Sequence, residues 1–360
     1  MKKKILSFAL CFVLCLSLFA GCGRKNRSAD VHVFYYTYSD TYISTVRAAL
    51  DRRLNEAGIS YQDYDANNSQ TTQTEQIQTA VTKGAKLLVV NIVTTGSDDA
   101  ANGIISLARS SGIPVIFFNR EVSDSVVNSY EKCIYVGTNA TEAGKLQGDM
   151  IGDYLVKNYE KTDLNGDGKI SYVLFMGEKG NNEAIYRTKY SVENANEKLT
   201  AAGKPELVFY DASNKDKFLL DKDGKWSAQA ANEYMTTALT TYNSANKNMI
   251  ELVICNNDNM AEGAITALQT AGFNIGANGS ISIPVFGVDA IDAAKSLIRA
   301  GKMAGTITQD GNEMAKCMEI AIKNVLEQKS MLENMGEYNV DETVEKVRIP
   351  YGIYTGEENG

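Results

Sequence analysis

Histidine is almost absent from this chain: His32 is the only one in 360 residues. It alternates with Val31 and Val33 in a run typical of a strand, so we expect a side chain held within a sheet. A Ser-His-Asp triad, a Cys-His pair or a histidine-ligated metal would each need this one residue. The sequence therefore supports none of these sites. A carboxylate pair for glycoside hydrolysis stays open, because any two acidic groups can meet in a fold.

Cysteine, proline and clustered positive charge are also scarce. Cys133, Cys255 and Cys317 form an odd, scattered set in apolar sequence, so we expect small buried side chains rather than disulfide partners. Four prolines and no low-complexity segment predict a compact body. The net charge is -8 and no basic patch is present, which argues against nucleic acid or an anionic membrane as the main partner.

The N-terminal segment has the pattern of an export signal. A basic head at residues 2–4 precedes an apolar run over residues 5–20. The stretch Leu18-Phe19-Ala20-Gly21-Cys22 resembles a lipobox, with phenylalanine where leucine is usual. We therefore predict a lipoprotein signal peptide over residues 1–21, a lipid anchor on Cys22, a tether over 22–29 and a location on the outer face of the cell membrane. The alternative, an uncleaved membrane helix, is disfavoured because the run is short and ends in small residues.

One pattern occurs twice in the body of the chain. The apolar run Ile113–Asn119 enters through a proline and ends in a polar group, as does Ile283–Asp289. Upstream, Leu87–Asn91 corresponds to Leu252–Asn256. Continuously apolar runs are typical of strands buried on both faces of a parallel sheet. Open sheets of this kind bind ligands beyond the carboxyl ends of their strands, so we expect the ends of these runs to face each other across a cleft.

The rest of the chain alternates strands with helices at short spacing. This predicts an α/β fold with two similar, doubly wound parallel-sheet lobes. Expected strands lie at residues 31–36, 61–64, 172–176, 207–210 and 305–308, and expected helices at 72–82, 100–109, 140–156, 184–199, 228–239, 260–270, 290–300 and 311–326.

A short acidic stretch has the oxygen spacing of a calcium loop. Oxygen side chains stand at the first, third and fifth places, glycine at the sixth and an aliphatic residue at the eighth. The twelfth place is Leu174, where the helical version of the loop has glutamate, so a distant carboxylate must complete the shell. The alternative is an ordinary polar turn. The candidate ligands within the loop are Asp163, Asn165, Asp167, the carbonyl of Lys169 and the hydroxyl of Ser171.

Two aromatic residues suggest a sugar ligand. Tyr42 follows the first strand and Trp226 is the only tryptophan. A hexose offers a flat C–H face to an aromatic ring and an edge of hydroxyls to carboxylates, amides and guanidinium groups. Either residue taken alone is as readily explained by core packing, so the pair needs support from the rest of the chain.

That support comes from a resemblance over about residues 29–351. The chain is similar to the galactose/glucose-binding proteins of sugar ABC importers, in the type I periplasmic-binding superfamily. The resemblance is carried, in order, by Tyr-Ser-Asp-Thr-Tyr (38–42), Pro-Val-Ile-Phe-Phe-Asn (114–119), Tyr-Val-Gly-Thr (135–138), the calcium loop, residues 251–258, Pro-Val-Phe-Gly-Val-Asp-Ala (284–290) and Ala-Gly-Thr (304–306).

The resemblance implies a set of site residues. Tyr42 and Trp226 would sandwich a pyranose ring, and Glu251 would supply the distant carboxylate of a structural Ca²⁺ site. Three positions depart from the family pattern but keep hydrogen-bonding groups: Asn181, Glu183 and Gln309. Their altered reach is enough to change sugar preference by roughly 1–3 kcal/mol. The positions that match the family's sugar-bonding residues are Asp40, Asn119, Arg187, Asn257 and Asp289.

The resemblance also implies an architecture and a role. One lobe would comprise residues 30–138 and 310–348, and the other residues 139–309 and 349–360, joined by a three-stranded hinge near residues 138, 309 and 349. A monomer without enzymatic activity would close on galactose or glucose, and an ABC permease would recognise the closed form. Alternatives are a sugar sensor for a membrane receptor, a receptor for another monosaccharide, and a glycosidase. A transcription regulator would need a basic helix-turn-helix where the export signal stands.

Overall fold

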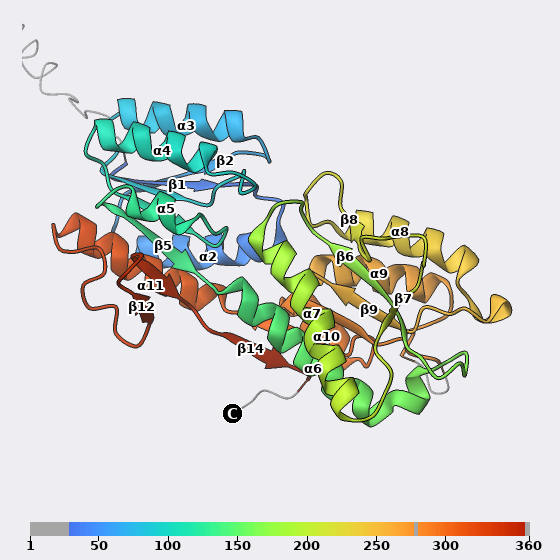
Figure 1. Ribbon diagram of the computed structural model, residues 1–360. Helices are drawn as coiled ribbons and strands as arrows, with labels where there is room; N and C mark the ends of the chain where they lie inside the picture. The colour runs from blue at the N-terminus through green and yellow to red at the C-terminus, as the bar shows by residue number, and fades with distance from the viewer. Residues whose placement is uncertain (1–28, 277–279, 357–360) are drawn as a thin grey trace, which may run out of the picture.

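The structure is a computed structural model that describes residues 29–276 and 280–356. The predicted signal peptide, the anchor at Cys22 and most of the predicted tether lie outside the described residues. Within the described part, none of the helices combines the length and apolar character needed to cross a membrane. Figure 1 shows two lobes side by side, each built around one sheet.

The first lobe holds the N-terminal strands and two strands from near the end of the chain. Its described strands are β1 (Val31–Tyr35), β2 (Tyr61–Asp65), β3 (Leu87–Val90), β4 (Val115–Phe118), β5 (Cys133–Gly137), β12 (Asn339–Asp341) and β13 (Lys346–Arg348). Its described helices are α2 (Thr41–Glu56), α3 (Gln70–Thr82), α4 (Asp99–Ser110), α5 (Asp124–Asn128) and α11 (Gly311–Leu326).

The second lobe holds the central part of the chain and one late strand. Its described strands are β6 (Ser171–Met176), β7 (Val208–Phe209), β8 (Leu219–Leu220), β9 (Leu252–Cys255), β10 (Val285–Asp289), β11 (Gly305–Gln309) and β14 (Tyr351–Tyr354). Its described helices are α6 (Ala140–Thr162), α7 (Asn182–Ala201), α8 (Ala228–Thr241), α9 (Asp258–Thr270), α10 (Asp292–Arg299) and the 3₁₀ turn η1 (Ser244–Asn246).

The two sheets repeat one strand order. The run β5-β4-β3-β1-β2 in the first lobe corresponds to β11-β10-β9-β6-β7 in the second. The register matches as well: Leu88 pairs with Val115 in the first lobe, and Val253 with Val285 at the same places of the duplicated pattern. The predicted α/β fold with two similar doubly wound lobes is therefore confirmed.

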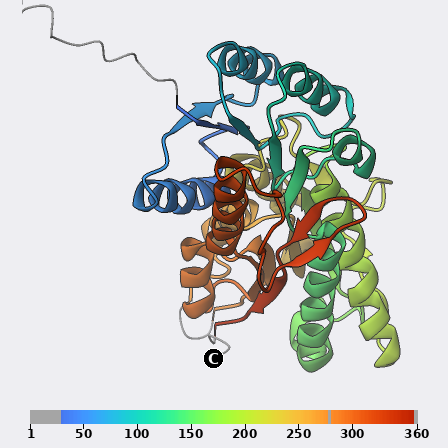
Figure 2. The ribbon, with the colours of Figure 1, turned by 90° about the vertical axis from the view of Figure 1, so that its left-hand side faces the viewer.

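Both faces of each sheet are covered by helices, which explains the continuously apolar strands. In β1, Val33 packs with α2 and α11, whereas Phe34 packs on the opposite face with α3 and α4. In β6, Val173 packs with α8 and α9, and Leu174 with α6 and α7. The turned view in Figure 2 shows helices on either side of the sheets. Cys133, one of the three described cysteines, is buried as a free thiol, and the others, Cys255 and Cys317, are too, as predicted.

The sheets are not wholly parallel as predicted. β14 runs antiparallel to β11, and β12 antiparallel to β13. The direction of β14 follows from the chain path. β13 is parallel to β5 and so ends at the interlobe edge, where the chain enters the second sheet from the carboxyl ends of its strands. A strand entering from that edge must run against its neighbours.

The chain passes between the lobes three times, each time at this edge. It leaves the first lobe between β5 and α6, returns between β11 and α11, and crosses again between β13 and β14. The carboxyl ends of the two sheets therefore face each other. The residues that follow these strands are placed at a common interface.

A buried lysine fixes β13 in the first lobe. Lys346 is 1% exposed and lies 2.8 Å from the Oε1 of Glu121 and 2.7 Å from the Oδ1 of Asp124. Its Nζ also donates to the carbonyl of Val122 at 2.9 Å. This cation holds the strand that leads into the third crossing.

We expect Lys346→Met to lower the free energy of unfolding by about 2 kcal/mol, because the carbonyl of Val122 loses its charged donor and Glu121 keeps only Arg348 as a cationic partner. Urea unfolding followed by circular dichroism would measure this. The matched control is Lys86→Met, which breaks the exposed pair with Asp30 and should cost less than about 1 kcal/mol. Equal losses in the two variants would contradict the structural role given to Lys346.

Candidate functional site between the lobes

A small cavity of about 40 Å³ lies between the lobes where the carboxyl ends of the strands meet. Both lobes contribute to its lining. Arg120 is one lining residue, and the others are all predicted site residues: Asp40, Tyr42, Asn181, Glu183, Arg187, Trp226, Asn257 and Asp289. The meeting of the two sheets thus brings residues from distant parts of the sequence to one place.

Three of these residues are held by capping the helices that follow the strands. Asp40 caps α2 by accepting from the N–H of Ile43 at 2.8 Å. Asn181 caps α7, and Asn257 caps α9 through the N–H of Met260 at 2.9 Å. A capping side chain satisfies one free N–H of the first turn and stands at the positive end of the helix. Each therefore has a fixed position at the cavity.

Three site residues have left-handed backbone conformations. The φ angle is +59° at Asn119, +54° at Trp226 and +122° at Asp289. Residues other than glycine rarely adopt such angles, and each costs on the order of 1–3 kcal/mol. Asn119 directly follows β4, Asp289 ends β10, and Trp226 stands two residues before α8. The surrounding packing maintains this strain where side chains are aimed at the interface.

Arg187 is the central cation of the site. It is buried, lies 3.8 Å from Asp289 and donates to the carbonyl of Asn256 at 2.9 Å. Its Nη2 donates to the Oε1 of Gln309 and to the hydroxyl of Tyr351, both at 3.1 Å. These contacts fix the position of the guanidinium group.

Two predicted site residues, Asn119 and Gln309, lie outside the lining of this cavity. The Oδ1 of Asn119 accepts from Asn91 at 3.1 Å. Gln309 accepts a hydrogen bond from Arg187 and donates one to the hydroxyl of Thr138 at 3.3 Å. In this arrangement Gln309 orients Arg187 rather than lining the cavity.

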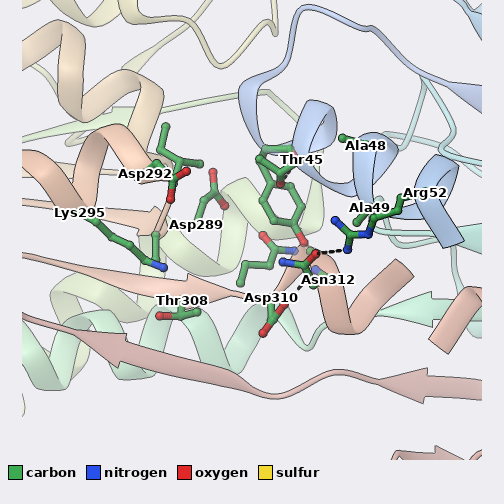
Figure 3. Close-up of a pocket in the computed structure, with 15 residues that line it drawn as sticks. Thr45, Ala48, Ala49, Arg52, Asp289, Asp292, Lys295, Thr308, Asp310 and Asn312 are labelled. Atoms are coloured by element: carbon green, nitrogen blue, oxygen red, sulfur yellow. Dashed lines mark hydrogen bonds between the residues drawn. The ribbon is translucent and has the colours of Figure 1, made fainter. Parts of the chain in front are cut away.

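Gln309 also borders a neighbouring pocket of about 370 Å³, which shares Tyr42 and Asp289 with the central cavity. Figure 3 shows Asp289 and Thr45 on opposite sides of this pocket, with Arg52 bonded to Asn312 at its edge. The pocket lies between α2 and α10, so it also spans the two lobes.

The carboxylate of Glu183 is buried without a partner. Glu183 is 5% exposed, and neither of its carboxylate oxygens has a hydrogen-bond partner among the described residues. Burial, with the negative charge of Glu121 as the second cause, raises the pKa of Glu183 to about 7. Burial also raises the pKa of Asp289 well above its usual range, an effect that Arg187 opposes. The cavity therefore contains acceptor groups that lack protein donors.

The indole of Trp226 packs closely against the backbone of Gly177. A Cβ on Gly177 would lie 2.2 Å from the indole, so only glycine allows this contact. The indole Nε1 donates to Glu178 at 3.3 Å, and the Cζ of Arg187 lies 5.8 Å from the ring centre. The ring is thereby held in a fixed plane at the cavity. Tyr42 is buried at the cavity wall in the other lobe.

Arg120 and Glu178 are polar residues of this region that the sequence analysis missed. Arg120 lines the cavity, and its Nη2 lies 2.6 Å from the Oε2 of Glu178 in the other lobe. A signal was present for each: Arg120 follows Asn119 directly, and Glu178 stands just after the strand at residues 171–176. Their pairing across the lobes is visible only in three dimensions.

The candidate calcium loop lies at the far end of β6. Asp163 accepts from the N–H of Gly166 at 2.8 Å and of Gly168 at 2.9 Å. Glu251, distant in sequence, accepts from the N–H of Leu164 at 2.7 Å and of Ser171 at 3.0 Å. The distant carboxylate and the loop are therefore adjacent.

The oxygens of this loop are of the type that calcium prefers. Among the described residues, no three acidic, histidine or cysteine side chains are grouped closely enough to hold a metal ion by themselves. A cation here would therefore need the amide of Asn165 and the carbonyl of Lys169 in addition to the carboxylates of Asp163, Asp167 and Glu251. The donor set fits calcium on those terms.

His32, the only histidine, lies away from the cavity in β1. Its Nδ1 is 2.9 Å from the hydroxyl of Tyr64 and its Nε2 is 3.0 Å from the carbonyl of Ala29. Burial lowers its pKa. Both ring nitrogens thus have partners within the first lobe.

We expect Glu183→Gln to stabilise the ligand-free protein at neutral and higher pH. The pKa of this carboxyl is raised in the folded state, so its ionised form destabilises the fold as pH rises from about 4.5 to about 7. The variant should gain on the order of 1–3 kcal/mol at about pH 8 and little at about pH 5. Thermal unfolding at both pH values measures the difference.

The control for that measurement is Glu160→Gln, which changes an exposed carboxylate paired with Lys204. Its unfolding temperature should differ little from that of the unchanged protein at either pH. A Glu183→Gln variant that is destabilised at the higher pH would contradict the buried, unpartnered state of this carboxylate.

Known proteins with similar sequences are binding proteins of the same two-lobed type. Residues 31–330 match the family model described as a periplasmic binding protein domain. The chain is 35% identical over 353 residues to the D-galactose/methyl-galactoside binding periplasmic protein MglB of Haemophilus influenzae, covering 98% of this chain and 96% of that protein. It is 23% identical to the ribose import binding protein RbsB of Escherichia coli, covering 89% and 92%.

Solved structures share the fold at lower sequence identity. An ABC transporter solute binding protein from Clostridium phytofermentans with bound β-D-glucose has a TM-score of 0.70 and 21% identity, covering 91% of this chain and 94% of that one. The Caulobacter myo-inositol binding protein has a TM-score of 0.67 and 20% identity, covering 93% and 96%. The chain therefore belongs to the periplasmic binding protein family and has the type I, two-lobed α/β fold.

Proposed function

We propose that this protein is an extracytoplasmic, lipid-anchored solute-binding protein that captures galactose or glucose between its lobes and delivers it to an ABC permease. The observation that carries the proposal is the cavity, which gathers predicted sugar-binding residues of both lobes at one buried place. The relative from Haemophilus influenzae, similar over nearly the whole chain, is named for D-galactose and methyl-galactoside binding.

The chemistry of the lining suits a hexose. The faces of Tyr42 and Trp226 provide apolar surface for the C–H groups of a sugar ring. Asp289 and Glu183 provide acceptors, and Arg187 provides donors. The unpartnered oxygens of Glu183 would accept hydrogen bonds from the hydroxyl groups of the sugar. No bond in the sugar would be made or broken.

Closure of the lobes follows from the placement of these groups. Asp40 and Tyr42 belong to the first lobe, whereas Arg187 and Asp289 belong to the second. A ligand that bonds to both sets stabilises the closed form by its differential affinity for it. The lobes at 30–138 with 310–348 and at 139–309 with 349–360 would move about the three crossings as a monomer.

The choice among hexoses would depend on Asn181, Glu183 and Gln309. These residues depart from the family pattern, and the reach of each differs by about one methylene or more. Relatives and structural neighbours are named for galactose, ribose, glucose and myo-inositol, so the fold itself does not set the ligand.

We expect isothermal titration to show binding of galactose or glucose, and Asp289→Asn to weaken it by at least about tenfold because an acceptor oxygen in the buried cavity is replaced by an amide donor. Trp226 is the only tryptophan, so its fluorescence should change on binding and serve as a second signal. Asp153→Asn, which alters an exposed pair with Lys198, is the control and should bind normally. No heat and no fluorescence change with either sugar would refute the proposal.

We further propose that Asp163, Asn165, Asp167, Lys169, Ser171 and Glu251 hold a structural Ca²⁺. Calcium would supply a positive charge that neutralises the facing carboxylates. Support comes from the spacing of the loop and from the bonds that place Glu251 against it.

Chelation by EDTA should lower the melting temperature by several degrees, and Asp167→Ala should have the same effect without chelator, because each removes ion binding that favours the folded state. Differential scanning calorimetry measures both. The control is Asp223→Ala, which lies in a shorter acidic turn paired with Lys225. Identical melting curves for the unchanged protein with EDTA and with added calcium would rule the site out.

A further inference from the structure

A single ion pair joins the two lobes directly among the described residues. Arg120 follows β4 of the first lobe, and Glu178 follows β6 of the second. Their Nη2 and Oε2 atoms are 2.6 Å apart, and the two side chains are 6% and 19% exposed. The other ion pairs in the described chain lie within one lobe. This pair is therefore a direct charged contact between bodies that separate when the lobes open.

Arg120 is fixed on its own side by two further contacts. Its Nη2 donates to the carbonyl of Val93 at 2.7 Å. Its guanidinium lies 4.4 Å from the centre of the Tyr36 ring, a cation–π distance. The first lobe thus presents a cation held in place before Glu178 meets it.

Glu178 is also bonded to the binding site of its own lobe. The same Oε2 accepts from the Nδ2 of Asn181 at 3.2 Å and from the Nε1 of Trp226 at 3.3 Å. The Oδ1 of Asn181 accepts from the N–H of Ala184, so both ends of this amide are occupied. One carboxylate oxygen therefore contacts two cavity residues and the cation of the opposite lobe.

The loop that carries Glu178 permits two close approaches. Gly177 leaves room for the indole of Trp226, as described above. At the other end, Gly180 has a φ of +81°, and a Cβ there would lie 3.1 Å from the Cα of Gly96 in the first lobe. Larger residues at these places would push the indole or the opposite lobe away. The loop is thus shaped for contact on both sides.

We propose that Glu178 is a positioning residue that couples the binding cavity to closure of the lobes. It orients Trp226 and Asn181 in one lobe and pairs with Arg120 of the other in the closed arrangement. The inference rests on the proposed sugar-binding function and adds a residue that does not itself line the cavity. Because the pair is broken on opening, its effect should fall on the rate of sugar release.

The test is stopped-flow tryptophan fluorescence with whichever of galactose and glucose the unchanged protein binds. Glu178→Gln should raise the dissociation rate at least about tenfold while changing the association rate less than about threefold. Arg120→Met should do the same. The double variant should be little worse than either single one, because each single variant already breaks the same contact between the lobes. Fully additive effects would overturn the coupling.

A conservative variant and a control separate this role from a general structural one. Arg120→Lys keeps the charge and should restore much of the slow release seen in the unchanged protein. Lys198→Gln breaks the ion pair with Asp153 on the surface of the second lobe and should leave release unchanged. Equal acceleration in Lys198→Gln and Glu178→Gln would overturn the proposal.

Small-angle scattering distinguishes failure of this inference from failure of the sugar-binding function. Glu178→Gln should give a larger radius of gyration than the unchanged protein, without sugar or at half-saturating sugar, since its closed form is less stable. If the unchanged protein binds neither sugar, the proposed function fails, yet the ligand-free profiles still report on the pair. Superimposable profiles of the two proteins in every condition would overturn the role of Glu178.

Discussion

The arrangement that governs this molecule is the meeting of two parallel sheets at their carboxyl ends. In a parallel sheet each strand is followed by a helix, so the residue between them often caps that helix. Here Asp40, Asn181 and Asn257 are such residues, and each stands at the interface of the lobes. Because both sheets present the same edge, polar groups from separate halves of the chain converge without any long loop to carry them.

The same arrangement is costly to the ligand-free fold. Glu183 and Asp289 are buried with raised pKa values, and Asn119, Trp226 and Asp289 have unfavourable backbone angles. Such features persist when the surrounding structure over-determines them. The helices packed on both faces of each sheet provide that support. The binding site is therefore a region of lower local stability built on two well-packed cores, and a ligand that satisfies its acceptors removes part of the cost.

The sequence was informative where local pattern and burial coincide. Uninterrupted apolar runs such as Val115–Phe118 predicted strands covered on both faces, and the repeat predicted two lobes. The antiparallel direction of β14 could not be read from its residues, because it depends on which edge of the sheet the chain enters. Nor could the pairing of Arg120 with Glu178, since two charged residues 58 positions apart meet only through the docking of the lobes. Gln309 was predicted as a sugar-binding residue from the resemblance to the family, whereas its hydrogen bond with Arg187 could be found only in the folded structure.

The three crossings of the chain between the lobes have a mechanical consequence. One linker would let two bodies swivel freely, and two would still permit twisting about the line through them. A third, held at one end by the buried Lys346 and at the other by the pairing of β14 with β11, restricts the relative orientation of the lobes further. If the lobes close on a sugar as proposed, these three connections would favour hinge-like closure over twisting.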